Sequence, residues 1–143
     1  MKNTFGNAVS MTIFGESHGP AVGAVLGLAA GLPVDEAAIA AAMDRRRARG
    51  DGLSTARTEA DAVEFLSGVY EGRTTGTAVT LMIRNLNTRS GDYAKTADLL
   101  RPGHADYTAY AKYEGFQDAR GGGHFSGRIT AASVAAGTIC ETV

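Results

Sequence analysis

The pattern of hydrophobic residues along the chain first predicts four β-strands. VSMTIF at 9–14 and AVGAVLGLAA at 21–30 are short apolar runs on either side of a glycine-rich interruption. AVEFLSGVY at 62–70 and TAVTLMIR at 77–84 form a second pair of such runs. Runs of this length, rich in valine and aromatic residues and bounded by glycine, are typical of strands. The EGRTTG segment between the second pair predicts an antiparallel hairpin with a longer connection.

Three other segments favour helices. Asp35 suits the N-cap position of the alanine-rich segment DEAAIAAAMDRRR, in which Ile39 and Met43 lie four residues apart on one face. Its closing arginines complement the negative end of the helix dipole. YTAYAKYEG at 107–115 and the apolar ITAASVAAGTIC at 129–140 are the other two predicted helices.

Two long segments have no apolar periodicity, and a third is glycine-rich. Residues 48–61 read as a loop, and residues 85–107 indicate either a binding loop or a disordered one, because structureless segments of that length are uncommon in compact domains. RGGGHFSG at 120–127 carries the glycines. No internal repeat is present. The sequence therefore predicts an α/β chain whose strands do not strictly alternate with helices.

Length and composition place the chain among single globular domains. Its 143 residues, 44% hydrophobic and 20% charged, suffice for one domain spanning 1–143. The sequence contains no apolar run of membrane-spanning length and no signal-peptide pattern, and its net charge of −1 gives no general basis for binding nucleic acid or a membrane. One cysteine, Cys140, cannot form an internal disulfide, so a cytoplasmic location is expected, with Cys140 as a small packing residue.

The segment GESHG at 15–19 matches the G-x-S-x-G pattern of a serine hydrolase nucleophile. In those enzymes the serine follows a strand of an established sheet and precedes a helix. Here only one predicted strand precedes the motif, and Pro20 and another strand follow it. The surrounding pattern therefore argues against Ser17 as a nucleophile and draws attention to His18.

All three histidines lie in loops that contain glycine. His18 lies beside Glu16, His104 follows a Pro-Gly pair three residues after Arg101, and His124 follows three glycines. Such positions suggest a site where imidazoles exchange protons near neutral pH. A zinc site is the competing hypothesis, but the spacings do not match those of zinc ligands and the single cysteine adds no support, so no metal is expected.

Arginines outnumber lysines by eleven to three. Five of them crowd the end of the first predicted helix and its loop, whereas Arg101 and Arg128 flank the later histidine loops. Because a guanidinium fork matches carboxylate and phosphate geometry, a small phosphorylated and carboxylated anion is the expected ligand. A solvated helix end and an arginine-rich composition are the alternative explanations for the first group.

A set of longer motifs, taken together, resembles chorismate synthase. They occur along the whole chain in the order found in that family: TIFGESHG at 12–19, DRRR at 44–47, LSGVYEG and TTGT within 66–77, RSGDY at 89–93, RPGHADYT at 101–108, RGGG at 120–123 and VAAG at 134–137. The resemblance covers the N-terminal part of the family's length, so the chain is expected to be a fragment or a shortened relative.

The resemblance implies a fold, a reaction and roles for particular residues. The fold would be an incomplete β-α-β sandwich of antiparallel strands packed with helices, and the family forms homotetramers. The reaction is a 1,4-anti elimination of phosphate from 5-enolpyruvylshikimate 3-phosphate that requires reduced FMN, with NADPH as a candidate reductant. His18 would protonate the leaving phosphate and His104 the reduced flavin. Four arginines would bind the substrate: Arg46, Arg47, Arg101 and Arg128.

The chain departs from the family pattern in two loops. Ala48 and Arg49 replace the residues expected after DRRR. His124, Phe125 and Ser126 stand at the family's FMN-contacting positions, where only Ser126 matches. A non-catalytic anion- or flavin-binding remnant therefore remains an alternative, as does a nucleic-acid-binding module that uses the arginine-rich loop.

Overall fold

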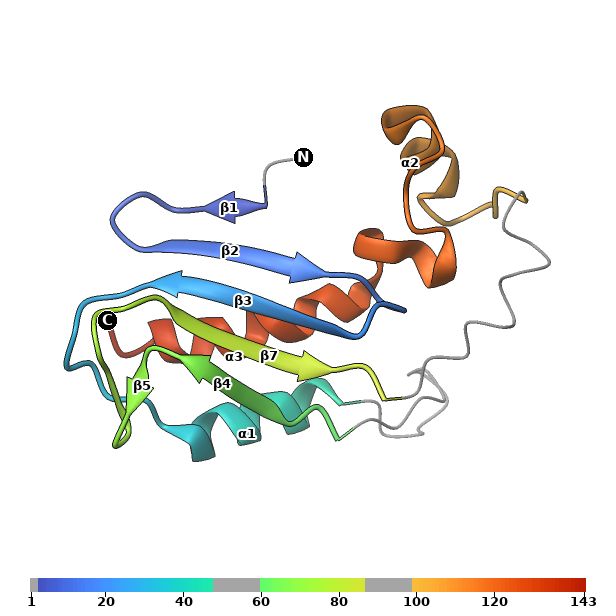
Figure 1. Cartoon of the computed structure of the whole chain (residues 1–143). Coiled ribbons are helices and arrows are strands. Elements are labelled where there is room, and N and C mark those ends of the chain that lie inside the picture. The colour runs from blue at the N-terminus through green and yellow to red at the C-terminus, as the bar shows by residue number, and fades with distance from the viewer. Residues whose placement is uncertain (1–2, 48–59, 87–98) are drawn as a thin grey trace.

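The computed structural model describes residues 3–47, 60–86 and 99–143 (Figure 1). Most of the loop predicted at 48–61, including Arg49 and Arg57, lies outside these residues. The same holds for most of the aperiodic segment 85–107.

The centre of the fold is an antiparallel sheet of five strands. All four predicted strands belong to it, and a short N-terminal strand that the hydrophobic pattern did not predict pairs at one edge. From that edge to the other, the strands are β1 (Thr4–Phe5), β2 (Ser10–Gly15), β3 (Ala21–Gly27), β7 (Val79–Arg84) and β4 (Val63–Ser67). The expected α/β class with antiparallel strands and packed helices is confirmed.

Alternation along the two central strands creates the core. Val22, Ala24 and Leu26 of β3 are fully buried, and their counterparts on β7 are Val79, Leu81 and Ile83. Every second residue of a strand faces the same side, so these six side chains form one apolar surface. Helix α3 (Thr130–Cys140) packs on this surface. Its buried residues are mostly alanines, which let the helix backbone lie close to the sheet.

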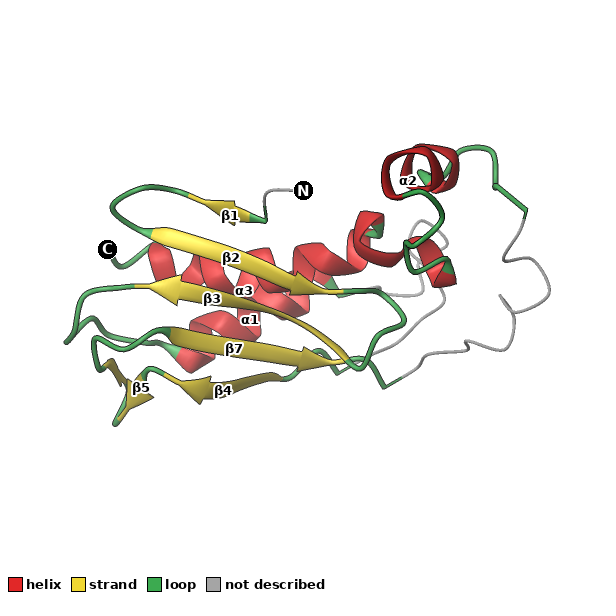
Figure 2. Cartoon of the chain, turned by 45° about the horizontal axis from the view of Figure 1, so that its top comes forward, coloured by secondary structure: helices red, strands yellow, loops and turns green. Residues whose placement is uncertain are grey.

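Helix α1 (Glu36–Arg46) packs beside α3 against the same face of the sheet (Figure 2). Asp35 caps it as predicted, because its carboxylate accepts a 3.0 Å hydrogen bond from the backbone N–H of Ala38. Ile39 and Met43 both face the core. The helix ends at Arg46, and Arg47 is its C-cap. This end of α1 lies beside the ends of the central strands (Figure 1).

The strand predicted at 62–70 is interrupted. Gly68 adopts φ +83°, and a Cβ there would lie 2.5 Å from Val79 Cα, so the chain leaves the sheet at this point. The remaining residues form β5 (Val69–Tyr70), which pairs with β6 (Arg73–Thr74) in a separate two-stranded hairpin. The hydrophobic pattern did not reveal the break because apolar residues continue on both sides of the glycine.

Helix α2 (Asp106–Tyr113), also predicted, stands away from the sheet (Figure 1). Two short 3₁₀ segments, η2 (Arg120–Phe125) and η3 (Gly127–Ile129), connect it to α3. Cys140 lies at the end of α3 against the core, and burial raises the pKa of its thiol, as expected for a packing residue.

Candidate functional site

The GESHG motif forms the turn between β2 and β3, at one end of the sheet. The end of β7, the last turn of α1 and the beginning of α3 lie at the same end (Figure 1). Residues far apart in the sequence therefore meet here, including His18, Arg46 and Arg128. This end of the sheet is the candidate site.

His18 and Ser17 are both buried in the turn, with 4% and 3% of their surfaces exposed. The Ser17 hydroxyl lies 3.1 Å from the carbonyl oxygen of Gly121 and 3.1 Å from Nδ1 of His18. A hydroxyl has one proton, and donating it to the carbonyl leaves Oγ as the acceptor for His18. In that arrangement the neutral imidazole carries its proton on Nδ1. This role for Ser17 differs from that of a hydrolase nucleophile.

The glycine loop gives the His18 ring its space. A Cβ on Gly121 would lie 2.1 Å from Cε1 and 2.2 Å from Nδ1 of that ring. Gly121, Gly122 and Gly123 all have positive φ, which residues with side chains rarely adopt. The backbone N–H of Ser17 also donates to the Gly123 carbonyl oxygen at 3.1 Å. The triple glycine thus packs against the histidine turn.

Arg46 and Arg128 converge on one buried carboxylate, that of Asp61. Arg46 Nη1 donates to Asp61 Oδ2 at 3.0 Å, and Arg128 Nη1 donates to Oδ1. Further donors of Arg46 bond to the Gly127 carbonyl and the Thr130 hydroxyl at 3.2 and 3.4 Å. The two guanidinium groups predicted to bind substrate are therefore brought together and held between α1 and η3.

Asn85, directly after β7, connects this arginine cluster to the histidine turn. Its Oδ1 accepts from Arg128 Nε at 2.9 Å. Its Nδ2 donates to the carbonyl oxygens of Glu16 and Gly19 at 2.9 and 2.8 Å. One side chain thereby fixes the position of the turn relative to Arg128.

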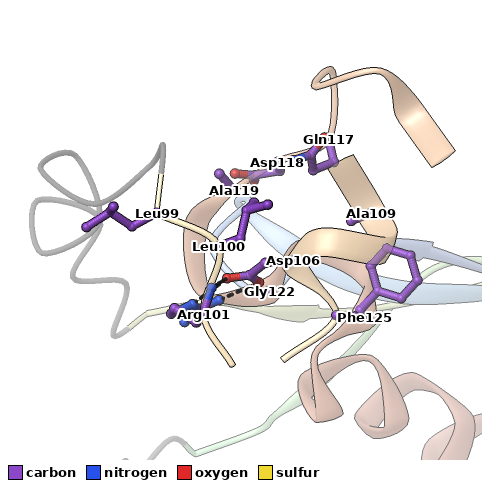
Figure 3. A pocket seen from close by; sticks show the side chains of 11 residues that line it. Leu99, Leu100, Arg101, Asp106, Ala109, Gln117, Asp118, Ala119, Gly122 and Phe125 are labelled. Atoms are coloured by element: carbon purple, nitrogen blue, oxygen red, sulfur yellow. Dashed lines mark hydrogen bonds and ion pairs between the residues drawn. The ribbon is translucent and has the colours of Figure 1, made fainter. Parts of the chain in front are cut away.

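The other two predicted substrate arginines have different surroundings. Arg47 donates to the Ala60 carbonyl oxygen at 2.9 Å and pairs with Asp44, so it is next to the cluster in sequence but has separate partners. Arg101 forms a bidentate pair with Asp106, in which Nε donates to Oδ2 at 2.7 Å and Nη2 donates to Oδ1 at 3.0 Å (Figure 3). These hydrogen bonds lower the pKa of Asp106. His104 lies exposed on the same turn.

A small cavity adjoins the Arg101–Asp106 pair. Figure 3 shows residues from the 99–101 segment, α2 and the glycine loop around it, with Phe125 on one side. Its volume of about 20 Å³ is the space of roughly one water molecule. A flavin ring does not fit there.

A larger groove lies beside His124. It measures about 580 Å³, within the range of about 300–1,000 Å³ typical of ligand pockets, and its walls include Phe14, Tyr113 and Phe116. The size and aromatic lining fit one face of a planar ring, although Phe116 is 91% exposed and encloses little. Burial lowers the pKa of His124, whose ring meets Tyr113 edge-on.

The three predicted cofactor residues therefore face different surroundings. His124 lines the groove, Phe125 lines the small cavity, and the Ser126 hydroxyl accepts from the backbone N–H of Arg128 as the cap of η3. The three histidines are likewise in separate environments: His18 buried, His124 half-buried and His104 exposed.

A pair of carboxyl groups lies between the groove and the glycine loop. Burial and the neighbouring Asp118 raise the pKa of Glu16, which lines the groove. Asp118 is held by Arg120, whose Nε and Nη2 donate to it at 2.8 and 2.7 Å, and the pKa of Asp118 is lowered. The pKa values of the two neighbouring carboxyl groups are therefore shifted in opposite directions.

Four residues of these networks were not predicted from the sequence: Asp61, Asn85, Asp106 and Asp118. All four are polar residues in or beside loops, where such residues are ordinary, so nothing in their spacing marked them. Across residues 3–47, 60–86 and 99–143, no three His, Cys, Asp or Glu side chains are grouped so that they could hold a metal ion. Within the same ranges, none of the helices has both the length and the apolar character needed to cross a bilayer.

The fold and site define a class of α/β proteins in which a histidine turn and an arginine cluster meet at one end of an antiparallel sheet. The family model for chorismate synthase matches residues 9–143. The chain belongs to the chorismate synthase family.

Individual relatives agree with this assignment. The chorismate synthases of Verminephrobacter eiseniae, Paracidovorax citrulli and Bordetella pertussis are 52, 55 and 54% identical to it over 140 residues, or 97% of the chain. A solved structure described as the crystal structure of chorismate synthase is similar to 95% of the chain, with a TM-score of 0.65 and 32% identity. The chain spans 38–39% of the three relatives and 33% of the solved chain.

Gly121→Ala should displace the His18 ring, because the added methyl group would overlap it. We expect the free energy of unfolding to fall by about 1–3 kcal/mol from the left-handed backbone alone, and by more because of the overlap. Denaturant unfolding and the imidazole NMR signals of His18 would measure both effects.

Gly122→Ala is the matched control, since Gly122 also has positive φ but its Cβ would meet nothing closer than 3.9 Å. It should lower stability through backbone strain and leave the His18 signals in place. Equal behaviour of the two variants would contradict the proposed packing of His18 on Gly121.

Arg101→Gln should raise the pKa of Asp106 towards its ordinary value of about 3.9, because the guanidinium hydrogen bonds are lost. In the wild type the folded-state pKa lies below the unfolded one. The pair therefore stabilises the fold above the ordinary pKa, and this contribution disappears as pH falls through the folded-state value.

The stability difference between wild type and Arg101→Gln should accordingly shrink below about pH 4. Carboxyl NMR titration of Asp106 gives the pKa directly, with Arg84→Gln as a control, since Arg84 pairs with Glu64 instead. An Asp106 titration that is the same in wild type and Arg101→Gln would refute the assignment.

Proposed function

We propose that this chain contributes the proton donor and the anion-binding arginines of a chorismate synthase. The reaction would be the 1,4-anti elimination of phosphate from 5-enolpyruvylshikimate 3-phosphate, with reduced FMN bound and NADPH as a candidate source of electrons. The observation that carries the proposal is the buried His18, oriented by Ser17 and joined through Asn85 to Arg128. Membership of the family supports the same reaction.

His18 has the properties required of the acid for the leaving group. With Nδ1 bonded to Ser17, a protonated imidazole presents its second proton on Nε2. Transfer of that proton to the departing phosphate oxygen relieves the charge that develops as the carbon–oxygen bond breaks. The glycine loop, which packs against the ring, limits the orientations that the imidazole can adopt.

The arginines supply the positive charge that the substrate needs. Arg46 and Arg128 present two guanidinium groups around one carboxylate, so their cluster keeps a net positive charge. Arg47 lies beside it, and Arg101 would bind a substrate carboxylate next to Asp106 or in its place. Preorganised cations of this kind stabilise phosphate as it leaves, because little reorganisation is required during the reaction.

The groove beside His124 is the proposed location of the flavin ring, which Phe14 and Tyr113 would help to hold. Reduced FMN would supply an electron-rich ring that offsets positive charge developing in the substrate. His104, on the exposed 101–106 turn, is the proposed proton donor to that ring by family resemblance. We further propose a cytoplasmic homotetramer without nucleic-acid or membrane partners.

A non-catalytic anion- or flavin-binding remnant is the second candidate. The observation that favours it is the environment of the cofactor positions: His124 lines the groove, whereas Phe125 lines the small cavity and the Ser126 hydroxyl caps η3. The experiments below separate a catalytic chain from such a remnant.

A chimaera tests the proposed function directly. Residues 1–143 would replace the matching segment of the Bordetella pertussis relative, which is 54% identical over that segment. We expect the chimaera to form chorismate from 5-enolpyruvylshikimate 3-phosphate under anaerobic conditions with reduced FMN, at a rate near that of the intact relative. A chimaera that folds and binds flavin but shows no turnover would favour the remnant.

The 143 residues assayed alone should show no measurable turnover, because the described groove supports one face of a flavin ring without enclosing it. Positioning accounts for about 7–11 kcal/mol of barrier lowering in well-oriented reactions, and that contribution would be lost. Chorismate formed by the isolated chain at an ordinary enzymatic rate would show that it builds a complete flavin site.

His18→Ala in the active chimaera should lower kcat by about 10²-fold or more, because the acid for the leaving phosphate is removed. Ser17→Ala should have a much smaller effect, since it removes only the hydrogen bond that orients the ring. Steady-state rates of both variants show which of the two side chains contributes more to turnover. A larger loss with Ser17→Ala than with His18→Ala would restore the nucleophile hypothesis.

A further inference from the structure

Asp61 occupies an unusual position for an aspartate. Its side chain is 4% exposed, and its backbone adopts the left-handed conformation with φ +47°, two residues before the start of β4. A buried carboxylate and a left-handed residue with a side chain each cost free energy. Both features together need a compensating interaction.

The two guanidinium groups provide that compensation. Each carboxylate oxygen accepts a hydrogen bond from one arginine: Oδ2 from Arg46 and Oδ1 from Arg128. The arginine side chains are themselves 21 and 13% exposed, so water screens the pairs weakly. With two positive charges and one negative charge, the cluster carries a net charge of +1.

The pairs that Asp61 forms with Arg46 and Arg128 also connect separate elements of the fold. Arg46 comes from the last turn of α1 and Arg128 from η3, and the described chain between them includes two strands of the sheet. Their other donors bond to the Gly127 and Arg84 carbonyl oxygens and to Asn85, so both guanidinium planes have fixed orientations. An anion that binds such preorganised forks avoids the entropy of ordering two long side chains.

We infer that Asp61 is a positioning residue, which holds the Arg46 and Arg128 guanidinium groups in the arrangement that binds a phosphorylated anion. This inference rests on the proposed function of these arginines. A carboxylate repels phosphate at long range. Asp61 would nevertheless favour phosphate binding, because it positions the two arginines. Charge repulsion and positioning thus predict opposite effects on phosphate affinity when the carboxylate is removed, and an experiment can distinguish them.

Asp61→Asn is the decisive variant, because asparagine has the same shape and tolerates the left-handed conformation. It raises the charge of the cluster from +1 to +2. Simple electrostatics predicts tighter phosphate binding, whereas loss of positioning predicts weaker binding. We expect the Kd for inorganic phosphate to rise at least tenfold.

The measurement is a phosphate titration of the full 143-residue chain, followed by the ¹⁵N NMR signals of the arginine Nε–H groups. In the wild type, phosphate should shift the Arg46 and Arg128 signals, and in Asp61→Asn the same signals should also exchange faster with water. Phosphate binding by the variant that equals or exceeds that of the wild type would overturn the inference. A wild-type chain whose Arg46 and Arg128 signals do not respond to phosphate would overturn it as well.

Glu64→Gln is the matched control. This substitution on β4 also removes one negative charge and one ion pair with an arginine. That arginine is Arg84, whose guanidinium group pairs with Glu64 and not with Asp61. Phosphate affinity should stay within about twofold of the wild type. A tenfold loss in this control would show that any lost carboxylate has the same effect, and the inference would fail.

Asp61→Glu covers the case in which Asp61→Asn does not fold. It keeps the charge and shifts the carboxylate by one methylene group, so weaker phosphate binding at constant net charge again supports positioning, and unchanged binding refutes it. An inactive chimaera combined with loss of phosphate affinity in Asp61→Asn would reject the proposed reaction and leave the role of Asp61 standing.

Discussion

The interaction on which the site depends is the contact of one buried carboxylate with two arginines. Asp61 bridges Arg46 and Arg128, and through Arg128 and Asn85 the network reaches the turn that carries His18. Breaking a buried pair on one side leaves an uncompensated charge and is strongly destabilising, typically by about 3–5 kcal/mol. The arrangement therefore behaves as a unit: the ends of α1, β7 and η3 keep their relative positions because their polar groups bond to one another.

The glycine loop adds a steric constraint to this electrostatic one. The His18 ring occupies the space where a side chain of residue 121 would stand, and the loop carbonyls receive the Ser17 hydroxyl and backbone N–H. Backbone flexibility at three consecutive glycines is thus used to bring a loop onto a histidine. The Ser17 hydroxyl thereby links the imidazole to the loop.

The other two histidines, His104 and His124, have looser surroundings than His18. Arg101 and Asp106 form a bidentate pair on the 101–106 turn, and α2 stands away from the sheet with Phe116 exposed beside it. The groove at His124 has aromatic walls but little cover. The chain spans 38 and 39% of the Verminephrobacter eiseniae and Bordetella pertussis relatives.

The sequence by itself determined the longer strands, the three α-helices and the chemistry available. Alternating apolar residues predicted the central strands, Asp35 and the Ile39–Met43 spacing predicted α1, and the motifs around His18, Arg101 and the glycine triplet indicated the family. These features are local, since each depends on residues within a few positions of one another. The interruption at Gly68 was not predicted, because the reason for it, a close approach to Val79, lies in the neighbouring strand.

Only the tertiary structure decided which polar residues act together. Asp61 and Arg128 are separated by 67 positions, and Ser17 and Gly121 by 104, so no spacing rule connects them. A carboxylate in a loop looks the same in the sequence whether it is solvated or buried between two arginines. The difference comes from burial, which removes water and makes each buried charge depend on partners that the fold brings to it.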